Sequence, residues 1–171
     1  MPEISVIISA YNCEDYISEA IESVLNQSFR DFELIVVDDG SQDATAAISS
    51  THGALVISHV TNQGKGSALR TGFEHALRSG YDGIVTLDSD GQHDPAEIPQ
   101  LIRAGEVQHA GLVIGNRMTD GRAMPRVRRW TNEVMSAIVS ALVRQSIPDS
   151  QCGFRFIRRE LLQDVPLRGQ R

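Results

Sequence analysis

Two aspartates separated by one residue, Asp88 and Asp90, follow a short apolar segment of the sequence. In an extended segment, this spacing places both carboxylates on the same face of the chain. Two carboxylates held together repel each other unless a positive charge lies between them, and a divalent cation with oxygen ligands meets that need. Gln92 could supply a neutral third ligand. The alternative is that Asp88 caps the next helix and Asp90 is a solvated turn residue.

Polar residues follow two other apolar segments. The acidic turn at residues 38–41 (Asp-Asp-Gly-Ser) has two interpretations. Either Ser41 caps a helix, or one acid accepts hydrogen bonds from the base or ribose of a nucleotide. Residues 64–66 (Gly-Lys-Gly) open a predicted helix, where free backbone N–H groups and one ammonium could hold a phosphate. Glycines alone are weak evidence for such a site, because the full phosphate-binding loop is not present.

Four arginines lie close together in the second half of the chain: Arg117, Arg126, Arg128 and Arg129. A run of like charges is usually a solvated face. Beside an acidic metal pocket, the same cations would neutralise a diphosphate, because guanidinium groups bind phosphate oxygens in pairs.

The charges of the 171 residues are distributed unevenly. Residues 1–100 hold 4 basic and 16 acidic side chains, a net of −12, whereas residues 101–171 hold 12 basic and 6 acidic ones, a net of +6. The acidic half argues against a general nucleic-acid binder. Cys13 and Cys152 are too few for a disulfide framework or a zinc site, and no secretory signal opens the chain, so we expect a cytoplasmic protein.

Short β-branched runs alternate with longer helical patterns, which predicts a Rossmann-like α/β fold with a mostly parallel sheet flanked by helices. The predicted strands are residues 4–9, 33–37, 54–60, 83–87, 112–115 and 153–157. The predicted helices are residues 14–27, 42–50, 66–79, 95–109, 130–145 and 158–164, the fourth with Asp94 as N-cap. Ligands bind at the carboxyl ends of parallel strands, so we expect the polar segments to share one edge of the sheet.

The predicted helix at residues 130–145 carries an apolar stripe at helical spacing, formed by Trp130, Val134, Ile138 and Leu142. Such a stripe most often packs on a sheet as core. The alternative is a helix on a membrane surface, because the basic residues before it would lie near anionic headgroups.

Six segments in the same order resemble family 2 glycosyltransferases with the GT-A fold, and in particular the polyprenyl-phosphate sugar synthases of the dolichyl-phosphate mannose synthase type. The segments are VIISAYN (6–12), VVDDGSQDAT (36–45), NQGKGSAL (62–69), DSDGQHDP (88–95), GNR (115–117) and DSQCGFR (149–155). The resemblance covers nearly the whole chain, so residues 1–171 are expected to form one GT-A catalytic domain, truncated at its C-terminus.

The resemblance implies an inverting transfer of sugar from a GDP- or UDP-sugar. The implied donor-binding residues are Ala10, Tyr11, Asn12, Glu14, Asp39, Lys65, Asp88 and Asp90. Mg²⁺ or Mn²⁺ would be held by Asp88, Asp90 and Gln92. Arg117, Arg128 and Arg129 would face the diphosphate or the acceptor phosphate, and Arg117 is one of two catalytic candidates.

The implied acceptor is a polyprenyl (dolichyl or undecaprenyl) phosphate, which would place the protein peripherally at the inner face of a membrane. A lipid phosphate is already ionised and needs little help from a base, whereas a hydroxyl acceptor on a glycan would need one. Asp149, the second catalytic candidate, would be that base, or else a turn residue beside Pro148. The alternatives are therefore a family 2 transferase acting on a glycan hydroxyl and a non-catalytic nucleotide-binding domain.

Overall fold

The computed structural model describes residues 3–89, 94–116 and 126–165, with the backbone alone for residues 126–129. Within these residues, six strands form one sheet in the order β3-β2-β1-β4-β6-β5. The strands are β1 (Ile4–Ala10), β2 (Phe32–Asp38), β3 (Leu55–Ser58), β4 (Gly83–Asp88), β5 (Leu112–Ile114) and β6 (Arg155–Arg158). Strands β1 to β4 pair in parallel and β6 is antiparallel to both of its neighbours, which confirms the mostly parallel α/β fold.

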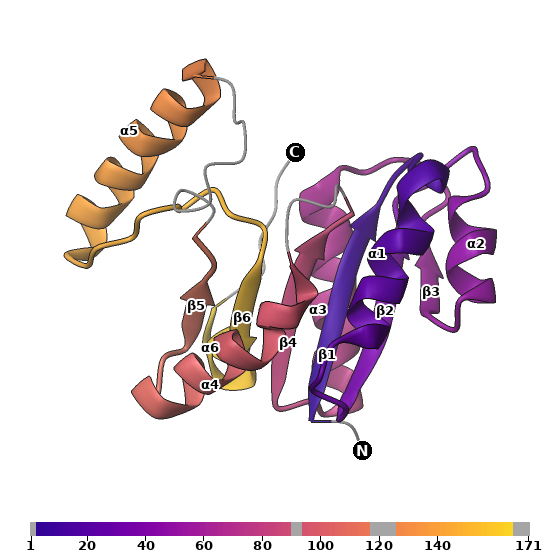
Figure 1. The fold of residues 1–171 in the computed structure, drawn as a ribbon, viewed down its shortest axis with the longest axis horizontal. Coiled ribbons are helices and arrows are strands. Elements are labelled where there is room, and N and C mark those ends of the chain that lie inside the picture. Colours follow the sequence, from indigo (N-terminus) through magenta and orange to yellow (C-terminus); the bar gives the residue numbers. More distant parts are fainter. Residues whose placement is uncertain (1–2, 90–93, 117–125, 166–171) are drawn as a thin grey trace.

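Helices cover both faces of the sheet (Figure 1). The helical elements are α1 (Glu14–Asn26), α2 (Thr45–Thr51), α3 (Lys65–Ser79), the 3-10 turn η1 (Pro95–Glu97), α4 (Ile98–Gln108), α5 (Arg126–Val143) and α6 (Arg159–Asp164). Helices α1 and α4 bury their apolar sides in one core cluster, together with alternate residues of β1. Helices α3 and α6 pack into a second cluster on the other face. Because both faces are covered, the central strands are apolar along their length, as the sequence predicted.

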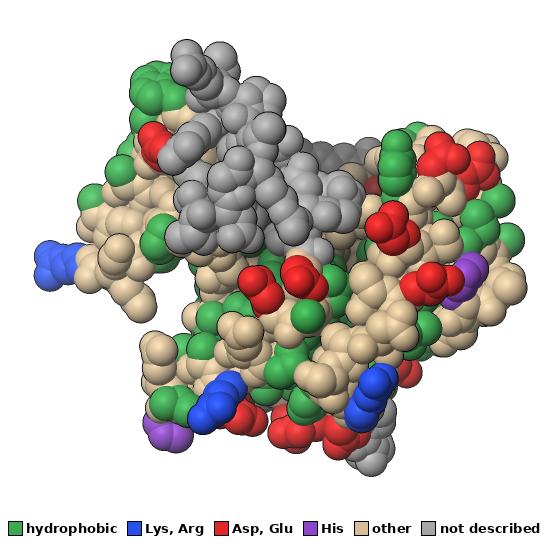
Figure 2. Space-filling view, in the orientation of Figure 1, with side chains coloured by type: hydrophobic (Ala, Val, Ile, Leu, Met, Phe, Trp, Pro, Cys, Tyr) green, Lys and Arg blue, Asp and Glu red, His purple; other side chains and the backbone are tan. Residues whose placement is uncertain are grey.

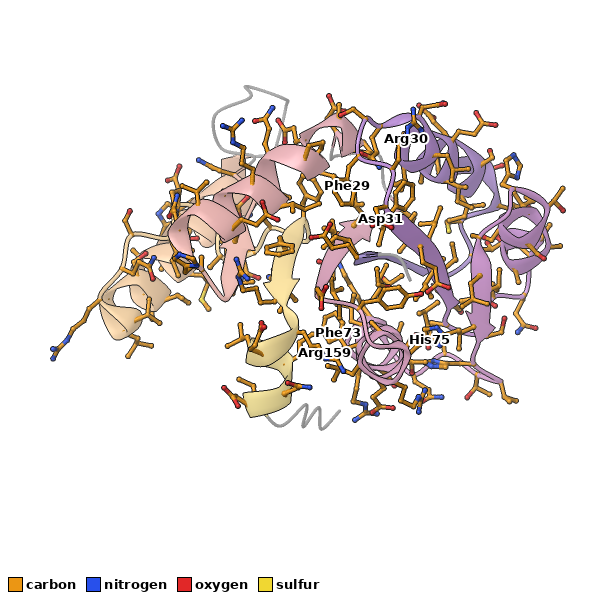
Figure 3. All side chains as sticks on the ribbon, turned by 90° about the horizontal axis from the view of Figure 1, so that it is seen from below. Phe29, Arg30, Asp31, Phe73, His75 and Arg159 are labelled. Carbon is orange, nitrogen blue, oxygen red and sulfur yellow. The ribbon has the colours of Figure 1, made fainter. Side chains whose placement is uncertain are left out.

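Helix α6 is fixed against α3 by its first residue. The guanidinium of Arg159, which Figure 3 labels, donates to the carbonyl oxygen of Leu77 in α3 at 3.4 Å. The predicted N-cap Asp94 is also confirmed, at the start of η1, because its carboxylate accepts the N–H of Ala96 at 2.9 Å.

Two predicted boundaries differ from the structure for physical reasons. Helix α2 begins at Thr45 rather than at residue 42, because the backbone N–H groups of Gln42 and Ala44 donate to side chains of the segment after β1. Ser41 does not cap a helix, since its hydroxyl accepts the N–H of Asn12 at 2.9 Å. Strand β3 is shortened to four residues, since the chain after Ser58 turns to place His59 against the end of β2.

The interpretation of the 130–145 stripe as core is wrong. Helix α5 projects away from the sheet (Figure 1), and the exposed fractions of Trp130, Ile138 and Leu142 are 67%, 49% and 78%. The opposite, polar side is the buried one, because the hydroxyl of Ser136 accepts the N–H of Ser150 at 2.9 Å. Figure 2 shows the hydrophobic side chains along the open side of α5. The helix therefore holds the chain near residue 150 and leaves its apolar stripe uncovered.

Candidate active site

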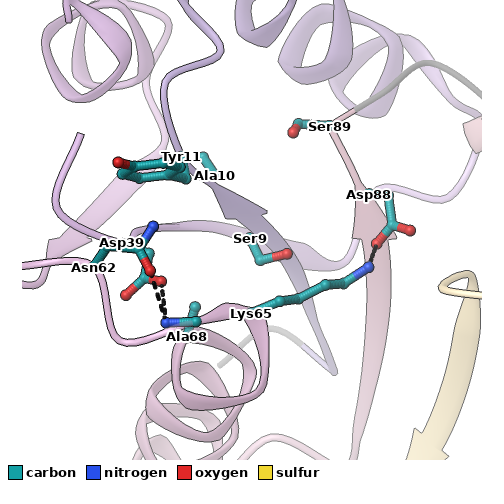
Figure 4. Close-up of a pocket in the computed structure, with 10 residues that line it drawn as sticks. Ser9, Ala10, Tyr11, Asp39, Asn62, Lys65, Ala68, Asp88 and Ser89 are labelled. Carbon is teal, nitrogen blue, oxygen red and sulfur yellow. Dashed lines mark hydrogen bonds and ion pairs between the residues drawn. The ribbon is translucent and has the colours of Figure 1, made fainter. Parts of the chain in front are cut away.

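A pocket of about 400 Å³ lies at the carboxyl ends of β1, β2 and β4, next to the start of α3 (Figure 4). The residues lining it are Ser9, Ala10, Tyr11, Asp39, Asn62, Gly64, Lys65, Ala68, Asp88 and Ser89. This is the edge at which an open parallel sheet binds ligands. Five of the predicted donor-binding residues, at positions 10, 11, 39, 65 and 88, therefore come together, although they lie far apart in the sequence.

Tyr11 stands at one side of this pocket and the pair formed by Lys65 and Asp88 at the other (Figure 4). The Tyr11 side chain is 47% exposed, so its ring offers an open aromatic face. Aromatic faces stack on nucleobases, at about 1–3 kcal/mol per base. The pocket thus has an aromatic platform at one end and a charged group at the other.

The carboxylate of Asp39 is buried and accepts hydrogen bonds from three groups of the protein. Oδ1 accepts the N–H of Gln63 at 3.0 Å and lies 2.6 Å from Nδ1 of His59, and Oδ2 accepts the N–H of Gly64 at 2.7 Å. An ionised carboxylate has about four lone-pair sites, so one site on Oδ2 is left for a ligand N–H. Asp39 therefore fixes the loop before α3 and still lines the pocket.

These contacts set the pKa of Asp39 below its ordinary value of 3.8. Burial raises the pKa, but the hydrogen bonds from Gln63, His59 and Gly64, together with the charge of His59, lower it by more. An ionised Asp39 therefore stabilises the folded state above about pH 3.8, and this contribution is lost as the pH falls through the folded-state pKa.

We therefore expect the free energy of unfolding of the wild type to fall more steeply than that of Asp39→Asn below about pH 4. The amide cannot titrate, so this share of the acid sensitivity disappears in the variant. Urea denaturation from about pH 6 to about pH 2.5 measures both slopes. Parallel curves for the two proteins would show that Asp39 does not contribute to acid unfolding.

Gly40 permits the close approach that joins the end of β2 to the segment before α3. Its φ is +78°, and a Cβ at this position would lie 2.6 Å from the carbonyl carbon of Thr61 and 2.8 Å from the nitrogen of Asn62. Both the backbone conformation and the contact exclude a side chain. The glycine of the acidic turn is therefore required by packing, independently of any ligand.

Two predicted donor-binding residues, Asn12 and Glu14, lie beside the pocket rather than among the residues that line it. The Asn12 Oδ1 accepts the N–H of Gln42 at 2.9 Å, and the Glu14 Oε2 accepts the N–H of Ala44 at 2.8 Å. Asn12 also has a positive φ of 47°. Both side chains fasten the turn after β1 to the turn after β2, and direct donor contact remains a prediction for them.

Lys65 and Asp88 form an ion pair across the floor of the pocket, with Nζ 2.5 Å from Oδ1. Their side chains are 53% and 18% exposed, so the lysine is largely in water while the aspartate is mostly covered. Lys65 is the first residue of α3, one residue before the predicted start at residue 66, and Gly64 before it has a φ of +91°. The start of α3 therefore brings this cation to the pocket, which Gly64 and Ala68 also line.

The Asp88 carboxylate lies directly against the backbone of Gly153. A Cβ at residue 153 would be 2.3 Å from Oδ2 and 2.5 Å from Oδ1 of Asp88. The Thr86 hydroxyl holds this backbone by donating to the carbonyl oxygen of Gly153 at 2.7 Å, and Arg155 donates to the carbonyl oxygen of Cys152 at 2.7 Å. The segment before β6 thus sets the position of a candidate metal ligand.

We expect Gly153→Ala to lower the proposed transfer rate by about 10-fold or more, because the new methyl group forces the Asp88 carboxylate to rotate. The free energy of unfolding should fall by no more than about 1–3 kcal/mol, the usual effect of overpacking. Gly111→Ala is the matched control, since Gly111 does not line the pocket and a Cβ there meets only Leu161, at 3.5 Å or more. Equal rates for the two variants would show that Gly153 does not position Asp88.

The remaining metal and phosphate candidates lie in segments that the structure does not describe. Asp90, Gln92 and Arg117 lie outside the described residues, as do the side chains of Arg128 and Arg129 in α5. Among the described residues, no cluster of three metal-binding side chains occurs. The Asp88 carboxylate fits a hard divalent cation, because it is an oxygen donor that already faces a positive charge in the pocket. The roles of the other candidates remain predictions.

Asp149 lies in a turn at residues 148–151 and is 1% exposed. Its carbonyl oxygen accepts the N–H of Cys152 at 3.3 Å. The structure therefore confirms the turn interpretation. A carboxylate this deeply buried is poorly placed to take a proton from an acceptor, so the general-base role remains a prediction that belongs to the hydroxyl-acceptor alternative.

Sequence reasoning missed three residues that position this site: His59, Gly153 and Arg155. Gly153 and Arg155 stand in the last of the six matching segments, but a small residue gives no sign of which side chain it accommodates. His59 follows the third strand, where its polarity could have marked it.

The model of the family described as glycosyl transferase family 2 matches residues 5–165. The chain is 32% identical over 151 residues to an undecaprenyl-phosphate mannosyltransferase of Micrococcus luteus, covering 84% of this chain and 61% of that protein. It is 31% identical over 172 residues to a polyprenol monophosphomannose synthase of Mycolicibacterium smegmatis, covering 95% and 64%. The chain thus spans less than two thirds of the length of these two relatives.

Among solved structures, the chain resembles glucosyl-3-phosphoglycerate synthase from Mycobacterium tuberculosis in complex with Mn²⁺, UDP and glucosyl-3-phosphoglycerate. The TM-score is 0.73 at 28% sequence identity, covering 96% of this chain and 60% of that one. The likeness agrees with the GT-A arrangement of the sheet and its helices.

Proposed function

The chain belongs to glycosyl transferase family 2, and on that premise we propose that it is the catalytic domain of an inverting, metal-dependent transferase. It would move a sugar from a nucleotide-diphosphate donor to a polyprenyl phosphate. The observation that carries this proposal is the pocket that places the Tyr11 ring opposite the Lys65–Asp88 pair. Support for the acceptor comes from relatives whose names specify undecaprenyl phosphate or polyprenol.

The donor would lie across the pocket with its base against Tyr11. The free site on Asp39 Oδ2 suits a single N–H of the base, and Ala10 lines the same end. Lys65 and the backbone N–H groups at the start of α3 would bind the diphosphate, because a helix N-terminus and an ammonium both attract anions. The base and the diphosphate of the donor thus each have a partner among residues already placed together.

Asp88, with Asp90 and Gln92, would hold Mg²⁺ or Mn²⁺. Such an ion acts as a Lewis acid and neutralises the charge on the leaving diphosphate. Support for a divalent ion comes from the related synthase that was crystallised with Mn²⁺ and UDP. Lys65 neutralises Asp88 in the ion pair described above, so the lysine would turn toward the diphosphate when the donor enters. Arg117, Arg128 and Arg129 are proposed to bind phosphate oxygens of the donor or acceptor.

A phosphate acceptor simplifies the chemistry that the protein must supply. A lipid phosphate is ionised at neutral pH and attacks the anomeric carbon without losing a proton, so no general base is needed. The site then has to align the two substrates and neutralise their charges. This fits a pocket whose one cation among the described lining residues is Lys65, and it fits the burial of Asp149, the general-base candidate.

An acceptor competition tests the proposal. The protein is incubated with radiolabelled UDP- and GDP-sugars, Mn²⁺ and either a short-chain polyprenyl phosphate or an oligosaccharide, and butanol extraction separates lipid-linked from water-soluble products. We expect label in the lipid phase from one of the donors. Label only on the oligosaccharide would favour the hydroxyl-acceptor alternative. Nucleotide binding without any transfer would favour a non-catalytic binding domain.

We further propose that α5 rests on the membrane surface that contains the acceptor, at the cytoplasmic face. Among the residues described, no helix is long and apolar enough to cross a bilayer. The exposed stripe on α5 and the arginines at its start instead have the pattern of an interfacial helix.

Trp130 is the single tryptophan of the chain and is 67% exposed on this stripe, which makes it a natural probe. We expect its fluorescence emission to shift to shorter wavelength when vesicles containing anionic phospholipid are added. Ile138→Glu combined with Leu142→Glu should weaken vesicle binding by about 10-fold or more. Val107→Glu is the control, because Val107 is an equally exposed apolar residue on α4. An unchanged emission would contradict the membrane role of α5.

A further inference from the structure

His59 joins three elements of the donor pocket although it does not line the pocket itself. It follows β3, and its side chain is only 10% exposed. Its Nδ1 lies 2.6 Å from Oδ1 of Asp39, at the end of β2, and its Nε2 lies 2.9 Å from the hydroxyl of Thr71, in the middle of α3. One imidazole therefore spans the space between the sheet edge and the helix that carries Lys65.

The direction of the hydrogen bond between His59 and Asp39 follows from its acceptor. The Asp39 carboxylate is ionised, since its pKa is lowered, and it can only accept, so Nδ1 of His59 carries the proton. Nε2 pairs with the hydroxyl of Thr71, which donates to an unprotonated Nε2 and accepts from a protonated one. In either case the imidazole links Thr71 to Asp39.

The orientation of Asp39 determines where α3 begins. Its two oxygens bind the N–H groups of Gln63 and Gly64, and Gly64 is the residue before the first turn of α3. Lys65 follows directly and reaches Asp88. A carboxylate free to rotate about its side-chain bonds would release the N–H of Gln63 and leave the N–H of Gly64 with Asn62 Oδ1, at 3.0 Å, as its remaining acceptor. The backbone at the phosphate end of the pocket would then be held less firmly.

We propose that His59 is a positioning residue of the donor site. By holding the Asp39 carboxylate, it fixes the position of the start of α3, and with it Lys65, before the donor diphosphate binds. The inference rests on the proposed function, because it assigns the pocket to a nucleotide diphosphate. His59 acts through Asp39 and touches no reacting group.

Two amide substitutions at His59 test the hydrogen bonds of its two ring nitrogens separately. In His59→Asn the amide nitrogen can take the place of Nδ1 and still donate to Asp39, whereas in His59→Gln the amide reaches toward Thr71 and leaves Asp39 without its donor. Both variants remove part of a buried ring, so we expect similar losses in the free energy of unfolding. A purely structural role for His59 would therefore affect both variants alike.

The readout is the Kd for UDP and for GDP with Mn²⁺, measured by isothermal titration calorimetry for the nucleotide that the wild type binds more tightly. We expect His59→Asn to stay within about 3-fold of the wild type and His59→Gln to bind about 10-fold more weakly or worse, as loss of a hydrogen bond to a charged group implies. Thr71→Val, which keeps the Asp39 contact, should resemble His59→Asn. Hydrogen exchange at the amides of Gln63 and Gly64 should be faster in His59→Gln alone.

Equal affinities in all variants, or equal losses in His59→Asn and His59→Gln, would overturn the role of His59 while leaving the donor site intact. If the wild type binds neither nucleotide, the proposed function fails and this inference fails with it. Unchanged hydrogen exchange at Gln63 and Gly64 in His59→Gln would also overturn it, whatever the affinity, because the proposed link acts through those two amides.

Discussion

Asp88→Ala is expected to lower the rate of sugar transfer by about 100-fold or more. The substitution removes a proposed metal ligand and the partner of Lys65, and a lost stabilisation of about 3 kcal/mol in the transition state corresponds to a factor of about 100. The fold should survive, because Asp88 is the last residue of β4, at the carboxyl end of the strand, and the lysine left without its partner is in contact with water.

Asp82→Ala is the matched control for this variant, since Asp82 precedes the same strand at its opposite end and is exposed. We expect Asp82→Ala to transfer sugar at nearly the wild-type rate. Both variants should unfold within about 1 kcal/mol of the wild type in urea. A rate for Asp88→Ala above about one tenth of the wild-type rate would remove Asp88 from the metal-binding machinery.

Asp39→Ala is expected to have the largest effect on stability, a loss of about 3–5 kcal/mol in the free energy of unfolding. The substitution removes the acceptor of the part-buried N–H of Gln63 and of the His59 ring, and it leaves the N–H of Gly64 with Asn62 Oδ1 as its remaining acceptor. Nucleotide binding should become too weak to measure, because the start of α3 loses its support.

Asp31→Ala is the control for this second variant, because Asp31 is an exposed aspartate that precedes β2, the strand that ends just before Asp39. Its removal should change the free energy of unfolding by no more than about 0.5 kcal/mol. Urea denaturation measures stability, and calorimetry measures binding. If Asp39→Ala is as stable as Asp31→Ala, the network around Asp39 does not hold the site together.

The sequence was sufficient to predict the sheet and the edge at which the pocket lies. Continuous β-branched runs such as residues 4–9 are typical of strands covered on both faces, and polar residues after each run mark the carboxyl edge. The order of the residues along the chain therefore predicts that Tyr11, Asp39 and Lys65 lie together, because parallel strands end on the same side.

The networks inside the site could not be predicted, because they depend on side-chain directions that no periodic pattern encodes. The pattern showed Asp39 as a possible ligand contact, but not that three donors of the protein already bind it. The prediction that the apolar stripe of α5 packs as core was wrong for a related reason. The spacing of apolar residues is the same in a helix that packs on a sheet and in one whose apolar side faces outward. The importance of Gly153 could not be predicted from the sequence, because it lies in leaving room for the Asp88 carboxylate.

The central claim is that the pocket between Tyr11 and Asp88 binds a nucleotide diphosphate together with a divalent metal ion. Isothermal titration calorimetry of UDP and GDP, each with and without Mn²⁺, tests it most directly. We predict saturable one-to-one binding of at least one nucleotide, weakened about 10-fold or more when Mn²⁺ is omitted and insensitive to Mn²⁺ in Asp88→Ala. Absence of binding by both nucleotides, or binding that neither Mn²⁺ nor Asp88→Ala alters, would contradict the account.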